Sequence, residues 1–429
     1  MNTRELTNDA KAILLLCGRF GKNDAVKPFN LREYNRLADW MQDRHIRPSD
    51  LIAESGRYLL KEAPSAIDNT RIHKLLARGA AMALAIEKWT NSGIWVICRS
   101  DAAYPQRLKQ HLKKQAPPIV YSIGDIGLLS HGGLAVVGSR NVNAGGQSFT
   151  QRIAEQSARC GLQIVSGGAR GVDQTAMISA LNAGGNVVGI LADSLLKAAV
   201  AKNFRNGIRE KRLVLISAYN PEARFNVGNA MGRNKYIYAL ADCGLVIDAD
   251  VDKGGTWAGA TEELRRNSGR PVFVRVDDDA TKGNQALLRL GALPFPQPPW
   301  GKDLFSQLKK KDREENQKTA KQTSLFNDEL PFVYPEEASI KEPVESYTIE
   351  KDSRSEGKQD ASQIQTTIPT NIYEAVLPLI LSKMDDWRSP KDMVKELDVR
   401  KVQLDEWLKR AIKEEKVEKK NRPVRYRRK

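Results

Sequence analysis

Short apolar runs alternate with helical patterns over the central part of the chain. The clearest runs cover residues 134–137, 163–165, 186–191, 213–217, 243–248 and 271–275. Nearly continuous apolar runs of this length are typical of strands that are covered on both faces of a sheet. The segments between them, such as 234–241 and 256–267, have helical spacing. The alternation predicts an α/β fold with a Rossmann-like, doubly wound parallel sheet.

The pattern changes on both sides of this sheet. Residues 1–92 carry apolar positions at helical intervals and predict a small helical domain, whereas further runs at 93–98 and 116–124 extend the sheet domain to 93–300. Residues 301–370 are rich in charged and polar side chains and predict a disordered linker, because they cannot bury enough apolar surface. Residues 371–429 regain periodicity as three helices and two short strands around a basic turn, which predicts a winged-helix-like domain.

Two strand-to-helix turns carry residues that suit an anion. Glycine lets the backbone approach closely, N–H groups at a helix start point at the anion, and arginine adds a charged fork. Because parallel strands end at one edge of a sheet, we expect the two turns to lie at the same edge. The alternative is that the glycines only make tight turns. The first turn holds Gly138, Ser139 and Arg140, and the second holds Ser166, Gly167, Gly168, Arg170 and Gly171.

Two further loops reach the same predicted edge. Arg233, Asn234 and Lys235 stand just ahead of a predicted helix, where cations oppose the helix dipole unless an anion is bound. Gly254, Gly255 and Thr256 form another glycine-hydroxyl helix start, and the adjacent Trp257 is expected to pack on the sheet. These residues join the candidate DNA- or phosphate-binding set.

Composition narrows the partner class. The formal net charge is +16, which favours an acidic partner, and nucleic acid before membrane because no apolar run reaches transmembrane length. The first residues are too polar for a signal peptide. Four cysteines lie far apart without metal-ligand spacing, which predicts a cytoplasmic protein with buried, reduced thiols and no metal site.

The glycine turns belong to a longer series of motifs. The series is Val137-Gly-Ser-Arg140, Ser166-Gly-Gly-Ala-Arg-Gly-Val-Asp173, Gly232-Arg-Asn-Lys235 and Gly269-Arg-Pro-Val-Phe273. In order and spacing it resembles the successive blocks of the DprA/Smf family of DNA-processing proteins, over about residues 93–292. The resemblance implies an extended Rossmann fold that binds single-stranded DNA, has no established catalytic activity and needs no cofactor. It also implies a homodimer formed through this domain, which protects incoming DNA and loads a RecA-type recombinase in natural transformation or DNA uptake.

The resemblance assigns roles to individual residues of this chain, and at three places the chain departs from the family's pattern. It assigns the residues of the first two turns to phosphate binding and the Arg233-Asn234-Lys235 block to the side of the DNA groove, where lysine replaces the usual second arginine. The departures indicate a divergent branch of the family. They are Met177 after Ala176 in place of histidine, Ala218 after Ser217 in place of glutamate, and Gly254-Gly255-Thr256-Trp257 in place of a serine-glycine turn.

Two other functions fit parts of the same pattern. A nucleotide-cleaving enzyme would use Glu262 or Asp173 as general acid or base. Against it, the sequence presents no nucleophile, metal cluster or activated histidine, and the neighbours Glu262 and Glu263 diverge on a helix. A nucleotide-sensing module in defence against foreign DNA would hold a mononucleotide in the same turns. The sequence favours a non-catalytic DNA-binding protein.

Overall fold

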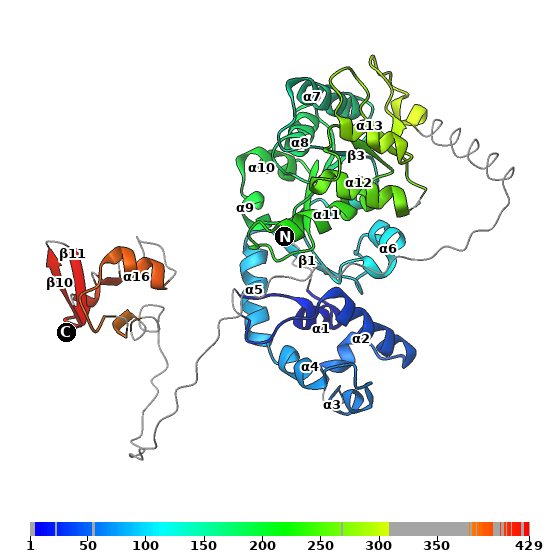
Figure 1. The fold of residues 1–429 in the computed structure, drawn as a ribbon. Helices are drawn as coiled ribbons and strands as arrows, with labels where there is room; N and C mark the ends of the chain where they lie inside the picture. Colours follow the sequence, from blue (N-terminus) through cyan, green and yellow to red (C-terminus); the bar gives the residue numbers. More distant parts are fainter. Residues whose placement is uncertain are drawn as a thin grey trace. The chain divides into compact units, whose positions relative to one another are not determined.

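The computed structural model describes two separate units of the chain. Contacts divide it into Met1–Pro331 and Phe332–Lys429. The first unit is described over residues 5–21, 24–53, 56–266 and 269–308, and the second over 377, 380–382, 384–397, 404, 407–408, 410–412, 414–421 and 424–428 (Figure 1). The predicted linker therefore falls almost wholly outside the described residues. Within the described part, no helix is both long enough and apolar enough to cross a membrane.

The first unit opens with the predicted helical region. The apolar helix α1 lies at its centre, with the side chains of residues 12–16 buried. Asn30 and Glu33 form a reciprocal capping box at the start of α2, which satisfies backbone N–H groups that the helix itself leaves without acceptors. The helices are α1 (Asn8–Cys17), α2 (Leu31–Asp43), α3 (Gly56–Leu59), α4 (Asn69–Leu76) and α5 (Gly79–Asn91), with 3-10 turns η1 (Pro48–Leu51) and η2 (Leu60–Glu62).

A nine-stranded, mostly parallel sheet follows, in the order β1-β2-β6-β5-β4-β3-β7-β8-β9. Strands β3 to β9 pair in parallel, while β2 pairs antiparallel with both β1 and β6. The α/β prediction is confirmed at this level. The strands are β1 (Trp95–Cys98), β2 (Ile119–Gly124), β3 (Leu134–Val137), β4 (Ile164–Ser166), β5 (Val187–Ile190), β6 (Leu213–Ser217), β7 (Cys243–Val246), β8 (Val272–Val274) and β9 (Leu293–Pro294).

Helices cover both faces of this sheet, as the continuous apolar runs predict. Along β3, Leu134 and Val136 pack into one buried cluster, whereas Ala135 and Val137 pack into another on the opposite face. The covering helices are α6 (Gln106–Leu112), α7 (Ala144–Arg159), α8 (Val172–Asn182), α9 (Leu195–Ala199), α10 (Lys202–Arg209), α11 (Val227–Leu240), α12 (Gly254–Arg266) and α13 (Lys282–Arg289), with η3 (Lys113–Gln115) and η4 (Ile126–Ser130) between strands.

Cysteines and the second unit agree in part with the sequence predictions. None of the four cysteines forms a disulfide, and Cys98 and Cys243 are buried while Cys17 and Cys160 keep partial exposure. In the second unit the hairpin of β10 (Val417–Asn421) and β11 (Val424–Arg428) and the helix α16 (Pro390–Leu397) match the prediction. Of the other two predicted helices, 372–380 lies largely outside the described residues and 402–412 is described at only part of its positions, so the winged helix stays a prediction.

Trp89 is one of the residues that pack the helical region against the sheet. Trp89 on α5 is 1% exposed and packs edge-on against Tyr121 of β2, with 5.0 Å between ring centroids. We expect Trp89→Ala to lower the free energy of unfolding by about 3–5 kcal/mol, because the cavity removes these contacts. Leu84→Ala on the same helix is the matched control, since Leu84 is 69% exposed. Equal losses in urea unfolding for the two variants would contradict this packing.

Candidate functional site

The strand order reverses beside β3, at the carboxyl ends of the central strands. From β3 the chain moves through β4 and β5 to β6, then returns to β7 on the other side of β3. In open α/β sheets ligands bind at such a reversal point, outside the carboxyl ends of the strands. Three of the predicted glycine turns follow β3, β4 and β7, and thus lie at this edge.

The first two turns pack directly against each other. The Val172 amide donates to the Ser139 carbonyl oxygen at 3.3 Å, and Arg170 Nη2 donates to Asn141 Oδ1 at 2.9 Å. Gly171, with φ +88°, leaves no room for a Cβ beside the Arg140 backbone, so glycine is required there for both conformation and space. The structure therefore brings the two turns to one edge, as the sequence predicts.

A carboxylate of the chain itself already occupies the space between the turns. Asp173, at the start of α8, is buried and accepts hydrogen bonds from the backbone amides of Gly138, Gly167 and Ala169. Burial raises the pKa of the Asp173 carboxyl, while Arg233 and these amides oppose the rise. These three amides therefore have an acceptor without any bound phosphate.

The predicted position of Arg233 ahead of a helix is wrong. Helix α11 begins at Val227, so Arg233 lies in the middle of the helix and its side chain is buried. Its Nη1 donates to the carbonyl oxygens of Gly167 and Ile190, and its Nη2 lies 3.7 Å from Asp173 Oδ2. A Cβ on Gly167 would overlap this guanidinium. Through these contacts Arg233 fixes the position of the second turn.

Asn234 and Lys235 point to other parts of the same edge. Asn234 Nδ2 donates to the Gly255 carbonyl oxygen at 2.6 Å, which ties α11 to the first turn of α12. That helix begins at Gly254, earlier than predicted, and Trp257 packs on the core as expected. The Lys235 Nζ lies 5.6 Å from the Tyr236 ring centroid, and burial lowers its pKa.

The hydroxyl groups of the predicted set differ in exposure. Ser166 is fully buried and its Oγ donates to the Val136 carbonyl oxygen at 2.7 Å, so it links β4 to β3. Ser139 is partly exposed and its Oγ accepts from the Asn141 amide at 3.1 Å. Thr256 is partly exposed in the first turn of α12. Of these three predicted residues, Ser139 and Thr256 can therefore present a hydroxyl to a ligand, and Ser166 cannot.

Exposed apolar side chains, which the sequence pattern does not predict, lie beside the first turn. The Arg140 guanidinium stacks over the Phe225 ring at 4.7 Å from its centroid, and Phe225 is 50% exposed. Val227 and Met231, one helical turn apart at the start of α11, are also exposed. An exposed aromatic ring beside an arginine is a combination typical of surfaces that bind single-stranded nucleic acid.

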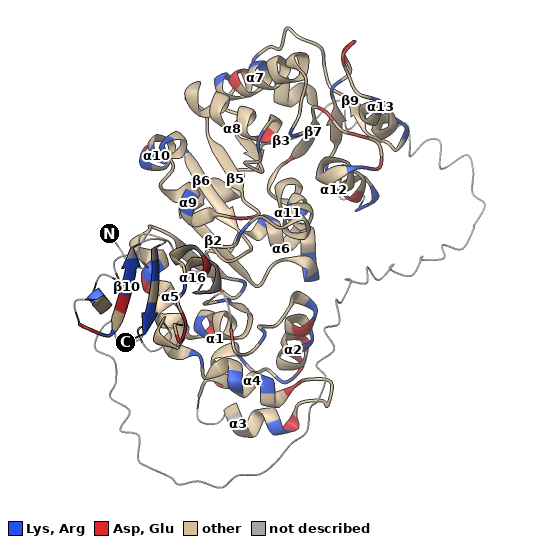
Figure 2. Cartoon of the chain, turned by 60° about the vertical axis from the view of Figure 1, so that its left-hand side comes forward, with Lys and Arg blue, Asp and Glu red and all other residues tan. Residues whose placement is uncertain are grey.

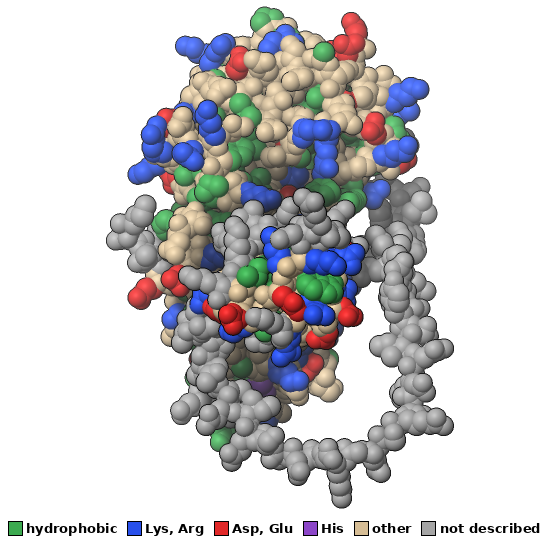
Figure 3. Space-filling view, turned by 90° about the vertical axis from the view of Figure 1, so that its left-hand side faces the viewer, with side chains coloured by type: hydrophobic (Ala, Val, Ile, Leu, Met, Phe, Trp, Pro, Cys, Tyr) green, Lys and Arg blue, Asp and Glu red, His purple; other side chains and the backbone are tan. Residues whose placement is uncertain are grey.

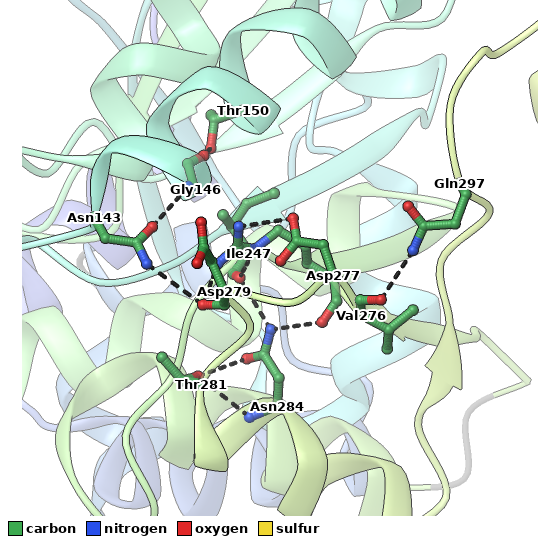
Figure 4. A network of polar contacts seen from close by, with 11 residues as sticks. Asn143, Gly146, Thr150, Ile247, Val276, Asp277, Asp279, Thr281, Asn284 and Gln297 are labelled. Carbon is green, nitrogen blue, oxygen red and sulfur yellow. Dashed lines mark hydrogen bonds and ion pairs between the residues drawn. The ribbon is translucent and has the colours of Figure 1, made fainter.

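The other half of the edge, beyond β7 and β8, is acidic. Aspartates at 248, 250, 252, 277, 278 and 279 follow these strands. Arg275, fully buried, donates to Ile247 O, to Asp277 Oδ2 at 2.9 Å and to Asp279 O (Figure 4). Burial raises the pKa of Asp248. Among the described residues no group of three or more His, Cys, Asp or Glu side chains is placed to hold a metal ion.

The Arg275 network also reaches the first turn. Asn143 Oδ1 accepts from the Gly146 amide at 2.7 Å and so caps α7, while its Nδ2 donates to the Asp279 carbonyl oxygen (Figure 4). Residues 138–143 are thus held at one end by Asp173 and at the other by this cap. The loop that carries Arg140 is fixed at both ends.

Comparisons with known proteins agree with this fold. The model of the family "DNA recombination-mediator protein A" matches residues 95–299. The DNA processing protein DprA of Bacillus subtilis (strain 168) is 27% identical over 226 residues, which cover 51% of this chain and 73% of that protein. DprA of Streptococcus pneumoniae is 29% identical over 197 residues, 45% of this chain and 67% of that protein. The X-ray structure of DprA from Streptococcus pneumoniae covers 68% of this chain and 95% of its own, with a TM-score of 0.52 at 19% identity, and so shows a common fold.

The buried pair gives a test of how the turns are held. We expect Arg233→Met to lower the free energy of unfolding by about 3–5 kcal/mol, because it leaves the Asp173 charge buried without its partner. Adding Asp173→Asn should recover part of the loss. Arg140→Gln, at an exposed position, is the control and should change stability by less than about 0.5 kcal/mol. An Arg233→Met protein as stable as the native one would show that the guanidinium is free for a ligand.

Proposed function

Because residues 95–299 belong to the DprA/Smf family of DNA recombination-mediator proteins, we propose that this chain binds single-stranded DNA along the carboxyl ends of β3 to β6. The carrying observation is the pair of exposed arginines, Arg140 and Arg170, on two turns that pack together. Neither has a carboxylate partner within the described residues, so both guanidinium groups are available to phosphate oxygens. Ser139 adds a hydroxyl beside them.

Phe225 favours single strands over duplex at this edge. Bases of a single strand can stack on an exposed aromatic ring, and an adjacent guanidinium can hold the neighbouring phosphate. Phe225 is half exposed and lies under Arg140, which supplies that combination. Because contacts to phosphate carry no sequence information, we expect weak sequence selectivity.

The charges along the edge restrict the path of the DNA. The aspartates that follow β7 and β8 repel a polyanion, whereas the turns after β3 and β4 carry Arg140 and Arg170. The strand therefore runs from the first turn towards Phe225, on the side of β4 to β6. In this proposal Arg233, Asn234 and Ser166 hold the turns in place, and Lys235 lies away from the DNA beside Glu262.

The proposal treats the chain as a non-catalytic mediator, in keeping with its family. Both acids of the enzyme alternative have other partners. Asp173 accepts from three backbone amides beside Arg233, and Glu262 pairs with Arg266 at 2.7 Å. These contacts make neither carboxylate a free general base.

The wider role follows the family by analogy. We propose a cytoplasmic homodimer, formed through the sheet domain 93–300, that protects incoming single strands and delivers them to a RecA-type recombinase during DNA uptake. The helical domain 1–92, the linker 301–370 and a winged-helix-like module at 371–429 complete the proposed organisation. No cofactor enters this proposal.

The exposed arginines provide the decisive experiment. We expect Arg140→Gln with Arg170→Gln to weaken binding of labelled oligo-dT by about 10- to 30-fold at about 0.1 M salt, because two phosphate contacts are lost. The slope of log affinity against log salt should fall in magnitude by about 1.4, at about 0.7 per contact on single strands. Titrations by fluorescence anisotropy across a salt series measure both quantities.

The control removes the same charge elsewhere. Lys74→Gln with Arg159→Gln neutralises two exposed cations, on α4 and at the far end of α7, and should leave oligo-dT binding nearly unchanged. Native affinity and native slope in the Arg140/Arg170 variant would refute the proposed groove.

A further inference from the structure

The C-terminal hairpin holds a dense group of cations that the proposed groove does not use. Residues 416–429 contain eight lysines and arginines and one acid, Glu418. In the ribbon coloured by charge, the strands of this hairpin are mainly blue (Figure 2). Over the face in Figure 3, by contrast, the blue and red side chains of the sheet domain are spread among uncharged ones.

The strand register gathers four charged side chains on one face. Glu418 lies opposite Arg427, and Lys420 lies opposite Arg425. Because side chains alternate along a strand, these four share a face. The other face holds Val417 and Tyr426, which are buried in the core of this unit. The charged face therefore points away from that core.

This face carries an electrostatic cost that a polyanion would relieve. Like charges directly opposite each other on neighbouring strands destabilise a hairpin, and Lys420 and Arg425 stand in that relation. Glu418 does not offset them, because it pairs with Arg427 at 2.8 Å. Arg427 also lies over the Trp387 ring, 5.0 Å from its centroid, and is therefore already oriented before any partner binds.

Protection of a sheet edge does not explain Arg425 and Arg427. Charged residues often occupy edge strands, where they prevent pairing with other chains. Strand β11 is not an edge, since it pairs with β10 on one side while Tyr426 exchanges both backbone hydrogen bonds with Arg388 on the other. Arg425 and Arg427 thus lie on a central strand and face solvent without that need.

We propose that the face formed by Lys420, Arg425 and Arg427 binds the phosphate backbone of double-stranded nucleic acid. It offers less aromatic surface than the sheet domain, because Tyr426 is buried and Trp387, with Arg427 over its ring, is only partly exposed, whereas Phe225 is 50% exposed. A duplex presents one charge per about 1.7 Å, the denser target for closely spaced cations. A two-stranded ribbon also fits the major groove. The C-terminal unit then binds duplex and the sheet domain binds single strands, which suits nucleic acid that has a junction between a duplex and a single strand.

Full-length protein tests this assignment. We expect Lys420→Gln with Arg425→Gln to weaken binding of a short labelled duplex about tenfold at about 0.1 M salt and to reduce the salt slope by about 1.8, at about 0.9 per contact on duplex. Oligo-dT binding should stay within about twofold, because single strands are held mainly on the sheet domain, where Phe225 is the more exposed ring. The Lys74→Gln, Arg159→Gln protein is the charge-matched control.

Each outcome separates this surface from the groove on the sheet. Native duplex affinity and slope in the hairpin variant, or an equal loss in the control, overturn the proposal. A loss confined to oligo-dT also overturns it, in favour of a single-strand surface. Failure of the Arg140/Arg170 variant to lose oligo-dT binding refutes the proposed groove alone, because the duplex measurement depends on different residues.

Discussion

The buried ion pair between Asp173 and Arg233 is the contact on which the edge of the sheet depends. Asp173 accepts from amides of both glycine turns, and Arg233 donates to the carbonyl oxygens of Gly167 and Ile190. Each charge requires the other, because either one alone would be buried without compensation. The ends of β3, β4 and β5 are therefore fixed by one pair of side chains before any ligand arrives.

This arrangement divides the cations of the family motifs into two layers. Arg233 is buried and its charge is neutralised by Asp173, whereas Arg140 and Arg170 are exposed on the turns. The inner layer removes the freedom of the loops that carry the outer arginines. Binding of a ligand then costs less conformational entropy than it would with mobile loops, because these loops are already ordered. Arg140 and Arg170 are thus available to a ligand, whereas Arg233 is already paired with Asp173.

The sequence predicts the strands and turns well, but it does not predict which of the arginines are buried and which are exposed. Buried parallel strands appear as continuous apolar runs, so β3 to β8 are visible in the chain. The start of α11 is hidden because Gly228 and Gly232 lower helix propensity, although Asn226 is a favourable N-cap that accepts a hydrogen bond from the Asn229 amide. The burial of Arg233 cannot be seen in the sequence either. Its partners are Gly167 and Ile190, which lie 66 and 43 residues away and meet it only after the sheet forms.

The acidic half of the edge has a structural origin that also serves the proposed groove. Arg275 is fully buried and needs nearby oxygens, and the loop of aspartates after β8 supplies Asp277 and the Asp279 carbonyl. That loop in turn holds Asn143, which caps α7 and fixes the far end of the first turn. The residues that support Arg140 from this side thus bring negative charge with them. Because screening limits their repulsion to roughly 10 Å, it acts mainly on a polyanion that follows the β7 side.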